Sequence, residues 1–403
     1  MRTARYSKLI SKGILLLVLL LGYSCRKDRS DWNPDSQGFN FSVDQDYILK
    51  NGKPFDVQGI VYVPGYPGFL PWDIEASTNL PTHLKASIRK DIRDIKAMGL
   101  NTIRLWGAPE YCYEAIKNVG GLHFIQTIWI DGEAPDFQNS QFKSQTKAYI
   151  RSIVDRIYRV YDDKEPPLVA ILIGNELSQA SIKATNQAHP NLNQYLGAHI
   201  QTDTSRNASE VFLAEMADYC RLYELQEYGR ASLLAYANDI RTFDDIDAPF
   251  LDFIAHNAYS YAVPFYRPLT RPGSSSNRYF QGWVEEVKAK HPDIPLLITE
   301  TGLSVSPKVR RMGPPNYGYG GNSEKDQSEG ILANIEDLKT AKAPVAGYCI
   351  HEYLDAWWKF GYQDSFSQDS NDIEEWFGLV KLKDSADWYS TEFRPSYYSI
   401  QNR

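Results

Sequence analysis

The chain of 403 residues is long enough for one large domain or two average ones, and its 43% hydrophobic and 23% charged content is typical of a globular protein with a sizeable core. The formal net charge of -7, with no basic run beyond the N-terminal stretch, argues against a nucleic-acid partner. The 9 Trp and 27 Tyr bring the aromatic content to 13%, which suits apolar cores and sugar rings alike.

The N-terminus carries an export pattern. Four basic residues precede an apolar run from Ile14 to Leu21, which is too short to span a bilayer, so residues 1–24 are predicted to be a signal peptide. The small residues before Cys25 resemble a bacterial lipobox, in which the cysteine becomes lipidated; plain secretion is the alternative. Residues 25–44 are mostly polar and are predicted to form a flexible tether. We expect an exported lipoprotein at the outer membrane, cell surface or periplasm, held to the membrane by this anchor only.

A short β-hairpin is expected next, because Asn51-Gly52 is a strong two-residue turn between Tyr47–Leu49 and Phe55–Val57. Eight apolar segments predict strands at Val57–Val63, Asn101–Trp106, Phe124–Ile130, Leu168–Gly174, Ser232–Ala237, Phe253–Ala258, Leu296–Thr299 and Ala346–His351. Helical spacing predicts helices at His83–Met98, Glu110–Asn118, Phe142–Tyr161, Glu210–Tyr228, Tyr279–Lys290 and Lys325–Thr340, with a weak fifth one near Thr242–Ile246.

This alternation over residues 45–403 predicts an α/β fold, a (β/α)8 TIM barrel with a short N-terminal hairpin under its floor. The long connections all follow strands, so these βα loops share the carboxyl-terminal face, where barrel enzymes place their active sites. A doubly wound open sheet is the alternative. It requires a glycine-rich phosphate loop that opens a helix, and Pro64–Gly68 after the first strand opens none.

Cysteine and histidine usage gives no sign of a metal or cofactor. After Cys25 only Cys112, Cys220 and Cys349 remain, and their spacing matches no metal framework. An odd number excludes complete intramolecular pairing, so buried free thiols are expected. The 7 His do not cluster at strand ends, which argues against a metal-dependent hydrolase on the same fold. We therefore expect no cofactor and no metal.

Two of the predicted strands end in a carboxylate. LVAILIGNE (Leu168–Glu176) closes strand four and LLITE (Leu296–Glu300) closes strand seven. These strands lie across a barrel mouth from each other, so the two acids can flank one sugar ring, as retaining glycosidases require at a separation of about 5–5.5 Å. We expect burial and the neighbouring charge to raise the pKa of Glu176, the proton donor, while Glu300 stays ionised.

At these motifs the chain resembles glycoside hydrolase clan A, whose members are barrels with Asn-Glu ending strand four and Glu ending strand seven. The resemblance runs from about Tyr47 to the C-terminus. It rests on NGKPF (Asn51–Phe55), NTIRLWG (Asn101–Gly107), GNE (Gly174–Glu176), HNAY (His256–Tyr259), TETG (Thr299–Gly302) and HEYLDAWW (His351–Trp358). It implies that Glu176 is the acid and base and that Glu300 is the nucleophile.

The resemblance also implies supporting residues around the two acids. Arg104, at the end of strand two, is expected to hold Glu300 ionised through a charge-assisted hydrogen bond. Tyr259 matches the strand-six tyrosine that hydrogen-bonds the nucleophile. Asn175 is expected to donate its amide to the sugar 2-hydroxyl, an interaction that strengthens in the transition state.

Further candidates follow strands six and eight. His256 and Asn257 are neighbours, and because side chains alternate along a strand only one of them can face the cleft. Either Trp357 or Trp358 is expected to form the platform beneath the sugar. The sequence does not choose between them.

Details within the clan point in two directions. Gly-Asn-Glu without a following proline, together with Thr-Glu-Thr-Gly, is similar to the laminarinase and β-1,3-glucanosyltransferase branches. The endings Glu374–Val380 (EEWFGLV) and Arg394–Gln401 (RPSYYSIQ) are instead similar to the β-galactosidase and β-glucuronidase barrels. Glu352 and Asp355, on the strand-eight rim, are expected to be substrate contacts or solvated charges.

The function expected from these motifs is that of a retaining β-glycoside hydrolase or transglycosylase acting on a polysaccharide or oligosaccharide, with β-glucan favoured. A glycan-binding surface lipoprotein that keeps the barrel without turnover is the alternative. The paired acids argue against it, because a binding protein has no need of an electrostatically strained site. The partner is a carbohydrate in both cases, and the oligomeric state is not indicated.

Overall fold

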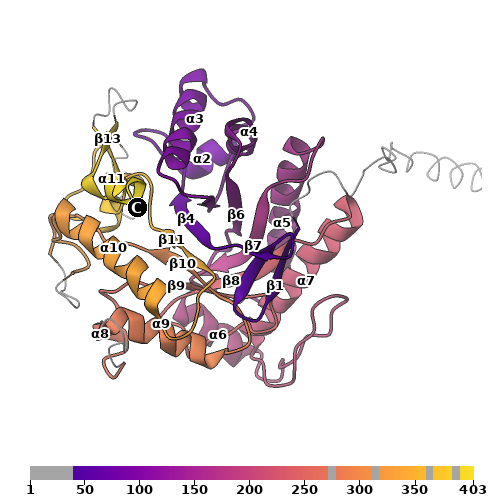
Figure 1. Cartoon of the computed structure of the whole chain (residues 1–403). Helices are drawn as coiled ribbons and strands as arrows, with labels where there is room; N and C mark the ends of the chain where they lie inside the picture. Colours follow the sequence, from indigo (N-terminus) through magenta and orange to yellow (C-terminus); the bar gives the residue numbers. More distant parts are fainter. Residues whose placement is uncertain (1–39, 271–277, 310–316, 360–365, 384–390) are drawn as a thin grey trace, which may run out of the picture. The chain divides into compact units, whose positions relative to one another are not determined.

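The computed structural model describes residues 40–270, 278–309, 317–359, 366–383 and 391–403 (Figure 1). The predicted signal peptide (1–24), Cys25 and most of the predicted tether lie outside the described residues, so their assignments stay predictions. Within the described ranges, no helix combines the length and the apolar character needed to cross a membrane.

Eight parallel strands form a closed barrel in the order β10-β11-β4-β5-β6-β7-β8-β9. They are β4 (Val57–Tyr62), β5 (Thr102–Leu105), β6 (His123–Ile128), β7 (Leu168–Asn175), β8 (Leu233–Asn238), β9 (Ile254–Asn257), β10 (Leu296–Thr301) and β11 (Gly347–Ile350). Each strand pairs with its neighbours in sequence, and β11 closes the barrel on β4. The predicted (β/α)8 barrel is therefore confirmed, and the doubly wound alternative is wrong.

Helices form at the predicted positions and surround the strands (Figure 1). They are α3 (Thr82–Ala97), α4 (Glu110–Val119), α5 (Ser140–Val160), α7 (Ala208–Tyr228), α9 (Tyr279–Lys290) and α10 (Glu324–Thr340). In α3 the buried positions Leu84, Ile88, Ile92 and Ile95 follow the predicted helical spacing and face the outside of the strands. A separate cluster, which includes Val61, Leu172 and Leu297, fills the barrel interior.

The weak helix predicted at Thr242–Ile246 is not formed, and the segment between β8 and β9 contains only turns. Side-chain hydrogen bonds hold the turn at its start. Asp239 accepts hydrogen bonds from the backbone amides of Arg241 and Thr242, and the hydroxyl of Thr242 donates to Asn238. Asn and Asp side chains commonly stabilise turns in this way.

An antiparallel sheet of β1 (Phe41–Asp44), β2 (Tyr47–Lys50) and β3 (Lys53–Pro54) precedes the barrel. The predicted Asn51-Gly52 turn is present, and both residues have positive φ (52° and 75°), as a two-residue hairpin requires. The partner strand predicted at Phe55–Val57 is wrong, since Val57 already belongs to β4. The last four residues of the predicted tether, Phe41–Asp44, form strand β1 and are therefore not part of a flexible segment. Its Phe41 packs with residues at the amino-terminal ends of the barrel strands.

The loops at the opposite face carry short elements that periodicity did not predict. These are α2 (Pro71–Ala76), α6 (Gln179–Ala188), α8 (Val263–Tyr266), the 3-10 turn η2 (Glu374–Trp376), β12 (Val380–Leu382), β13 (Thr391–Phe393) and α11 (Pro395–Gln401). They are too short, or too polar, to show a clear period in the sequence. Of these, α2 contributes Trp72 and Glu75 to the cavity at the barrel mouth, whereas α11 packs beside α10.

Candidate active site

The end of β7 bends so that Glu176 leaves the strand. Gly174 (φ 87°) and Glu176 (φ 46°) both adopt left-handed backbone conformations, which are uncommon for a residue with a side chain. The pairing register with β8 shifts between Leu172 and Asn175, and the amide of Glu176 donates to the carbonyl of Ala237 at 2.9 Å. Left-handed non-glycine residues cluster at functional sites, where the surrounding structure holds them in place.

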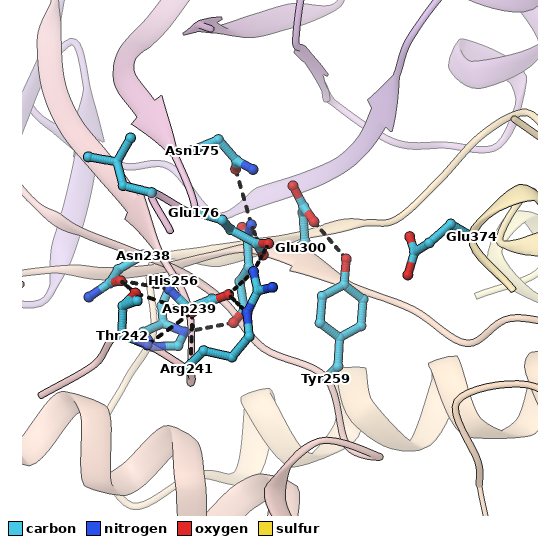
Figure 2. Close-up of polar contacts among 12 residues, drawn as sticks. Asn175, Glu176, Asn238, Asp239, Arg241, Thr242, His256, Tyr259, Glu300 and Glu374 are labelled. Carbon is cyan, nitrogen blue, oxygen red and sulfur yellow. Dashed lines mark hydrogen bonds and ion pairs between the residues drawn. The ribbon is translucent and has the colours of Figure 1, made fainter. Parts of the chain in front are cut away.

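Glu176 is held at each carboxylate oxygen. Asn257 donates from Nδ2 to Oε1 at 2.8 Å, and Arg241 donates from Nη2 to Oε2 at 2.6 Å (Figure 2). Burial raises the pKa of Glu176 to about 8, and the charges of Asp239 and Glu300 add to this rise against the opposing effect of Arg241. The direction is the one expected for a carboxylic acid that must carry a proton near neutral pH.

Glu300, at the end of β10, is buried with 3% of its surface exposed, and both of its oxygens accept hydrogen bonds. Arg104 donates from Nη1 to Oε1 at 2.7 Å, and Tyr259 donates its hydroxyl to Oε2 at 2.6 Å. Burial and the adjacent Glu300 charge raise the pKa of Tyr259 well above its usual value, so its hydroxyl remains a donor. Two donors on one buried carboxylate stabilise the ionised form of Glu300.

Arg104 connects the strand ends beneath both acids. Its buried guanidinium also donates to the Oδ1 atoms of Asn175 (2.7 Å) and Asn257 (3.2 Å) and to the carbonyl of Thr299 (2.9 Å). Asn257 in turn bonds Glu176 through its amide nitrogen. One side-chain amide therefore links Glu176 to the arginine that holds Glu300. The network brings together the predicted residues Arg104, Asn175, Glu176, Asn257, Tyr259 and Glu300.

His256 does not join this network. It faces outward from β9 and packs edge-on against Phe243 and Trp283, with ring centroids at 6.0 and 5.4 Å. Its Nδ1 bonds the carbonyl of Asn257 at 2.8 Å, and burial lowers the pKa of His256 to about 4. Of the two strand-six candidates, Asn257 is the one that faces Glu176, as the alternation of side chains requires.

Arg241 and Asp239 are the site residues that the sequence did not single out. Both follow β8, and Figure 2 shows them beside Glu176. The guanidinium of Arg241 bonds the carboxylates of both Glu176 and Asp239. One signal in the sequence points to this part of the site. Strand five ends in Asn238-Asp239, so polar residues follow an apolar strand there just as they do in strand four.

A second buried charge cluster lies on the strand-eight rim. Lys359 donates from Nζ to Oε1 of Glu352 at 2.8 Å and lies 3.2 Å from Nε2 of His351 and 3.6 Å from Glu374. Burial raises the pKa of Glu352 to about 7, against the opposing effect of Lys359. Glu352 is therefore a buried, paired acid and not the solvated charge that was one of its two expected states.

Asp355 is also buried and serves the fold. Its two oxygens accept from Nη1 and Nη2 of Arg394, each at 2.7 Å, and Gln368 and the backbone amide of Gly378 donate to it as well. The expectation of a substrate contact or a solvated charge is wrong for this residue. Asp355 fixes the strand-eight loop to the C-terminal segment that carries Arg394.

The two tryptophans of the strand-eight motif differ in environment. Trp357 is 7% exposed and belongs to the main core, whereas Trp358 is partly exposed and lines a cavity at the barrel mouth. Trp358 contacts Trp72 edge-on at 6.2 Å and Trp106 edge-on at 6.5 Å. Of the two platform candidates, Trp358 is the one that lines this cavity.

No family model and no curated protein matches the sequence. Solved structures, however, match the fold. In fold, the chain is similar to β-glucuronidases. The Bacteroides uniformis β-glucuronidase has 14% sequence identity and a TM-score of 0.59, over 90% of this chain and 37% of that chain. An uncultured Clostridium sp. β-glucuronidase has 16% identity and a TM-score of 0.58, over 91% of this chain and 53% of that chain.

The Ruminococcus gnavus β-glucuronidase gives a similar result, with 14% identity, a TM-score of 0.57, and coverage of 91% of this chain and 53% of that chain. The β-glucuronidase-like barrel thus corresponds to part of each of these longer chains, between 37% and 53% of their lengths. At this identity the likeness establishes the fold alone.

Metal-ligating residues do not gather in the part of the chain that the structure describes, where no group of three or more His, Cys, Asp or Glu could hold an ion. Cys112, Cys220 and Cys349 are buried free thiols, as predicted. Burial raises the pKa of all three, which makes them poor nucleophiles.

Proposed function

We propose that this chain is a retaining β-glycoside hydrolase in which Glu300 is the nucleophile and Glu176 is the general acid and base. The observation that supports it best is the unequal environment of the two carboxyls. Glu300 accepts hydrogen bonds from Arg104 and Tyr259, whereas the pKa of Glu176 is raised to about 8. Pairs of acids whose environments differ in this way divide the roles of nucleophile and proton donor.

In the first step Glu300 attacks the anomeric carbon while Glu176 donates its proton to the glycosidic oxygen, so that the leaving sugar departs as an alcohol. The product is a glycosyl ester on Glu300, and Glu176 is then ionised. In the second step Glu176 takes a proton from water, whose oxygen displaces Glu300 from the anomeric carbon. A sugar hydroxyl in place of that water gives transglycosylation.

The substrate that the charges favour is a neutral β-glycoside, and we propose a β-glucan or its oligosaccharides. Within the described ranges, three cations lie near the acids, and each is already bound to a protein carboxylate: Arg104 to Glu300, Arg241 to Glu176 and Asp239, and Lys359 to Glu352. A sugar carboxylate would have to displace one of these partners. A neutral ring would need no such exchange.

The proposal is tested with purified protein on aryl β-glucoside, β-galactoside and β-glucuronide and on β-1,3-, β-1,4- and β-1,6-linked glucans. Glu300→Ala and Glu176→Ala should each lose most of the hydrolysis, and NMR of the wild-type product should first detect the β-anomer. Added azide should restore turnover of an aryl glycoside, with β-glycosyl azide from Glu176→Ala and α-glycosyl azide from Glu300→Ala.

Two results would overturn the proposal. An α-anomer as the first product would require a single displacement. Binding of glucan by wild type, with no hydrolysis above that of the two variants, would instead support a non-catalytic glycan-binding protein. Preference for the glucuronide over the glucoside would keep the mechanism and overturn the neutral substrate.

We also propose that the protein is exported and anchored through a lipidated Cys25. The basic stretch, the short apolar run and the small residues before that cysteine support this location. Membrane fractionation of cells expressing wild type and Cys25→Ala tests it. Wild type should sediment with membranes and the variant should be soluble; equal distribution of both would contradict the anchor.

A further inference from the structure

A cavity of about 300 Å³ lies at the barrel mouth, where several of its lining residues follow the ends of β4, β5, β6 and β11. Four tryptophans line it: Trp72 from α2, Trp106 after β5, Trp129 after β6 and Trp358 after β11. We call this cavity the tryptophan pocket. Trp72 and Trp129 are each 45% exposed, although large aromatic side chains are normally covered. Exposed aromatic surface gathered in one concave site indicates a binding role.

Packed side chains connect the tryptophan pocket to the proposed nucleophile. The ring of Trp106 stacks on His351 at 5.7 Å, and His351 contacts Tyr259 edge-on at 6.0 Å. Tyr259 is the hydroxyl donor to Glu300. The Nζ of Lys359 lies 5.2 Å from the centre of the Trp106 ring. The pocket wall formed by Trp106 is therefore linked to Glu300 through two side chains, His351 and Tyr259.

Glu75 adds a polar group to this aromatic lining. Its Oε1 accepts from Tyr149 at 2.9 Å and from Arg156 at 3.3 Å, which fixes the carboxylate. Its Oε2 has no hydrogen-bond donor among the described residues. That oxygen lies against Gly107, another lining residue, where a Cβ would collide with it. An oriented acceptor beside aromatic faces matches a pyranose ring, which presents hydroxyl donors at its rim and C–H groups on its faces.

We propose that the tryptophan pocket is a second sugar-binding subsite, which takes a neutral pyranose ring of the same oligosaccharide whose bond is cleaved at Glu176 and Glu300. This rests on the proposed function. The volume is at the lower end of the ~300–1,000 Å³ range of small-molecule sites, so the pocket has space for about one ring. Glu75 is the charged group among the described lining residues, and its negative charge disfavours an anionic sugar.

The test compares a substrate that reaches the pocket with one that does not. Full-length wild type, Trp72→Ala and Trp129→Ala are assayed on aryl β-glucoside, which has one sugar ring, and on the trisaccharide that wild type cleaves fastest among laminaritriose, cellotriose and gentiotriose. Tyr47→Ala is the matched control, because Tyr47 is also 45% exposed but lies on β2. The tryptophan variants should lower kcat/KM for the trisaccharide about tenfold, equivalent to about 1.4 kcal/mol, and leave the aryl glucoside unchanged.

Equal rates on the trisaccharide for wild type and both variants would overturn the subsite, and so would parallel losses on both substrates. If wild type cleaves no glycoside, the proposed function fails, and calorimetry with laminaritriose then decides the subsite separately. Binding by wild type and Tyr47→Ala that is weakened about tenfold in Trp72→Ala supports the pocket. Equal or absent binding in wild type and Trp72→Ala overturns it.

Discussion

Nη2 of Arg241 lies 2.6 Å from Oε2 of Glu176, and the same guanidinium also binds Asp239. The proton donor of the proposed reaction therefore has one cation and one anion beside it, and their effects oppose each other. Asp239 raises the pKa of Glu176 and Arg241 lowers it, while burial sets the overall rise. The half-exposed arginine thus limits how far burial and Asp239 raise the pKa of Glu176.

The alkaline limit of activity should move in opposite directions when these two residues are changed. A general acid must be protonated, so activity should fall as pH rises through the Glu176 pKa of about 8. Arg241→Gln removes a charge that lowers this pKa and should shift the limit upward; Asp239→Asn should shift it downward. Each shift should reach up to about 0.7 pH unit, because a half-exposed ion pair is worth up to about 1 kcal/mol and one pKa unit is 1.36 kcal/mol.

The measurement is the pH profile of kcat/KM on an aryl β-glucoside from pH 4 to 10. The two variants control for each other, because a general loss of structure would move both limits the same way. Shifts of the same sign, or an unchanged alkaline limit in both, would contradict the assignment of Glu176 as the acid.

Neighbouring residues on β9 should give opposite results. Asn257→Ala removes the amide that bonds Glu176 and meets Arg104, so kcat should fall by roughly 10- to 100-fold, as expected for hydrogen bonds to charged groups of about 1.5–3 kcal/mol. His256 packs against Trp283 in the helix layer, so His256→Leu should keep activity within about twofold of wild type. Steady-state kinetics on one aryl glycoside checks both, and loss of activity in His256→Leu with an unchanged melting temperature would contradict the placement of His256.

The tandem tryptophans should separate stability from binding. Trp357→Ala opens a cavity in the core and should lower the free energy of unfolding by about 3–5 kcal/mol. Trp358→Ala removes a side chain that lines the cavity at the barrel mouth, so it should raise KM for oligosaccharides. Its loss of stability should be smaller than that of Trp357→Ala. Urea unfolding and Michaelis kinetics on the same samples distinguish the two. A raised KM in Trp357→Ala alone would reverse the platform assignment.

Breaking the Asp355–Arg394 pair should destabilise the protein. Both side chains are buried, so Asp355→Asn leaves the Arg394 charge, among the described residues, with only the more distant Glu324 carboxylate, 3.6 Å from its Nε, and should cost about 3–5 kcal/mol of unfolding free energy. Lys325→Gln, in an exposed ion pair with Glu329, is a matched control that should change stability by less than about 1 kcal/mol. Equal unfolding midpoints in urea for Asp355→Asn and wild type would show that the pair contributes nothing.

The barrel was predictable because its strands are buried on both faces and therefore form continuous apolar runs. Strand β7 was predicted within one residue at its end, and α9 matched at both ends. The positions of the acids were predictable because a strand of a parallel barrel brings its carboxyl-terminal end to the mouth, where Glu176 follows β7 and Glu300 precedes the last residue of β10. The strands and helices were thus predicted from hydrophobic patterns, and the acids from their positions at strand ends.

Other parts of the site have no such local pattern. Arg241 reaches Glu176 from the turn after β8, which side chains of Asn238 and Asp239 hold in place. Helix α2, which supplies Trp72 and Glu75, is six residues long and too short to show a period. The pairing of Asp355 with Arg394 joins positions 39 residues apart, and no spacing rule connects them. These contacts arise from tertiary packing, and tertiary packing leaves no periodic pattern in a single sequence.

The left-handed backbone at Glu176 has a consequence for anyone who would graft this centre onto another barrel. The position of its carboxylate depends on the main chain at Gly174 and Glu176, and on the bond from the Glu176 amide to Ala237, as much as on the glutamate itself. A glutamate placed at the end of a regular strand in a host scaffold would point elsewhere. The unit to transplant is therefore the whole turn with its β8 partner.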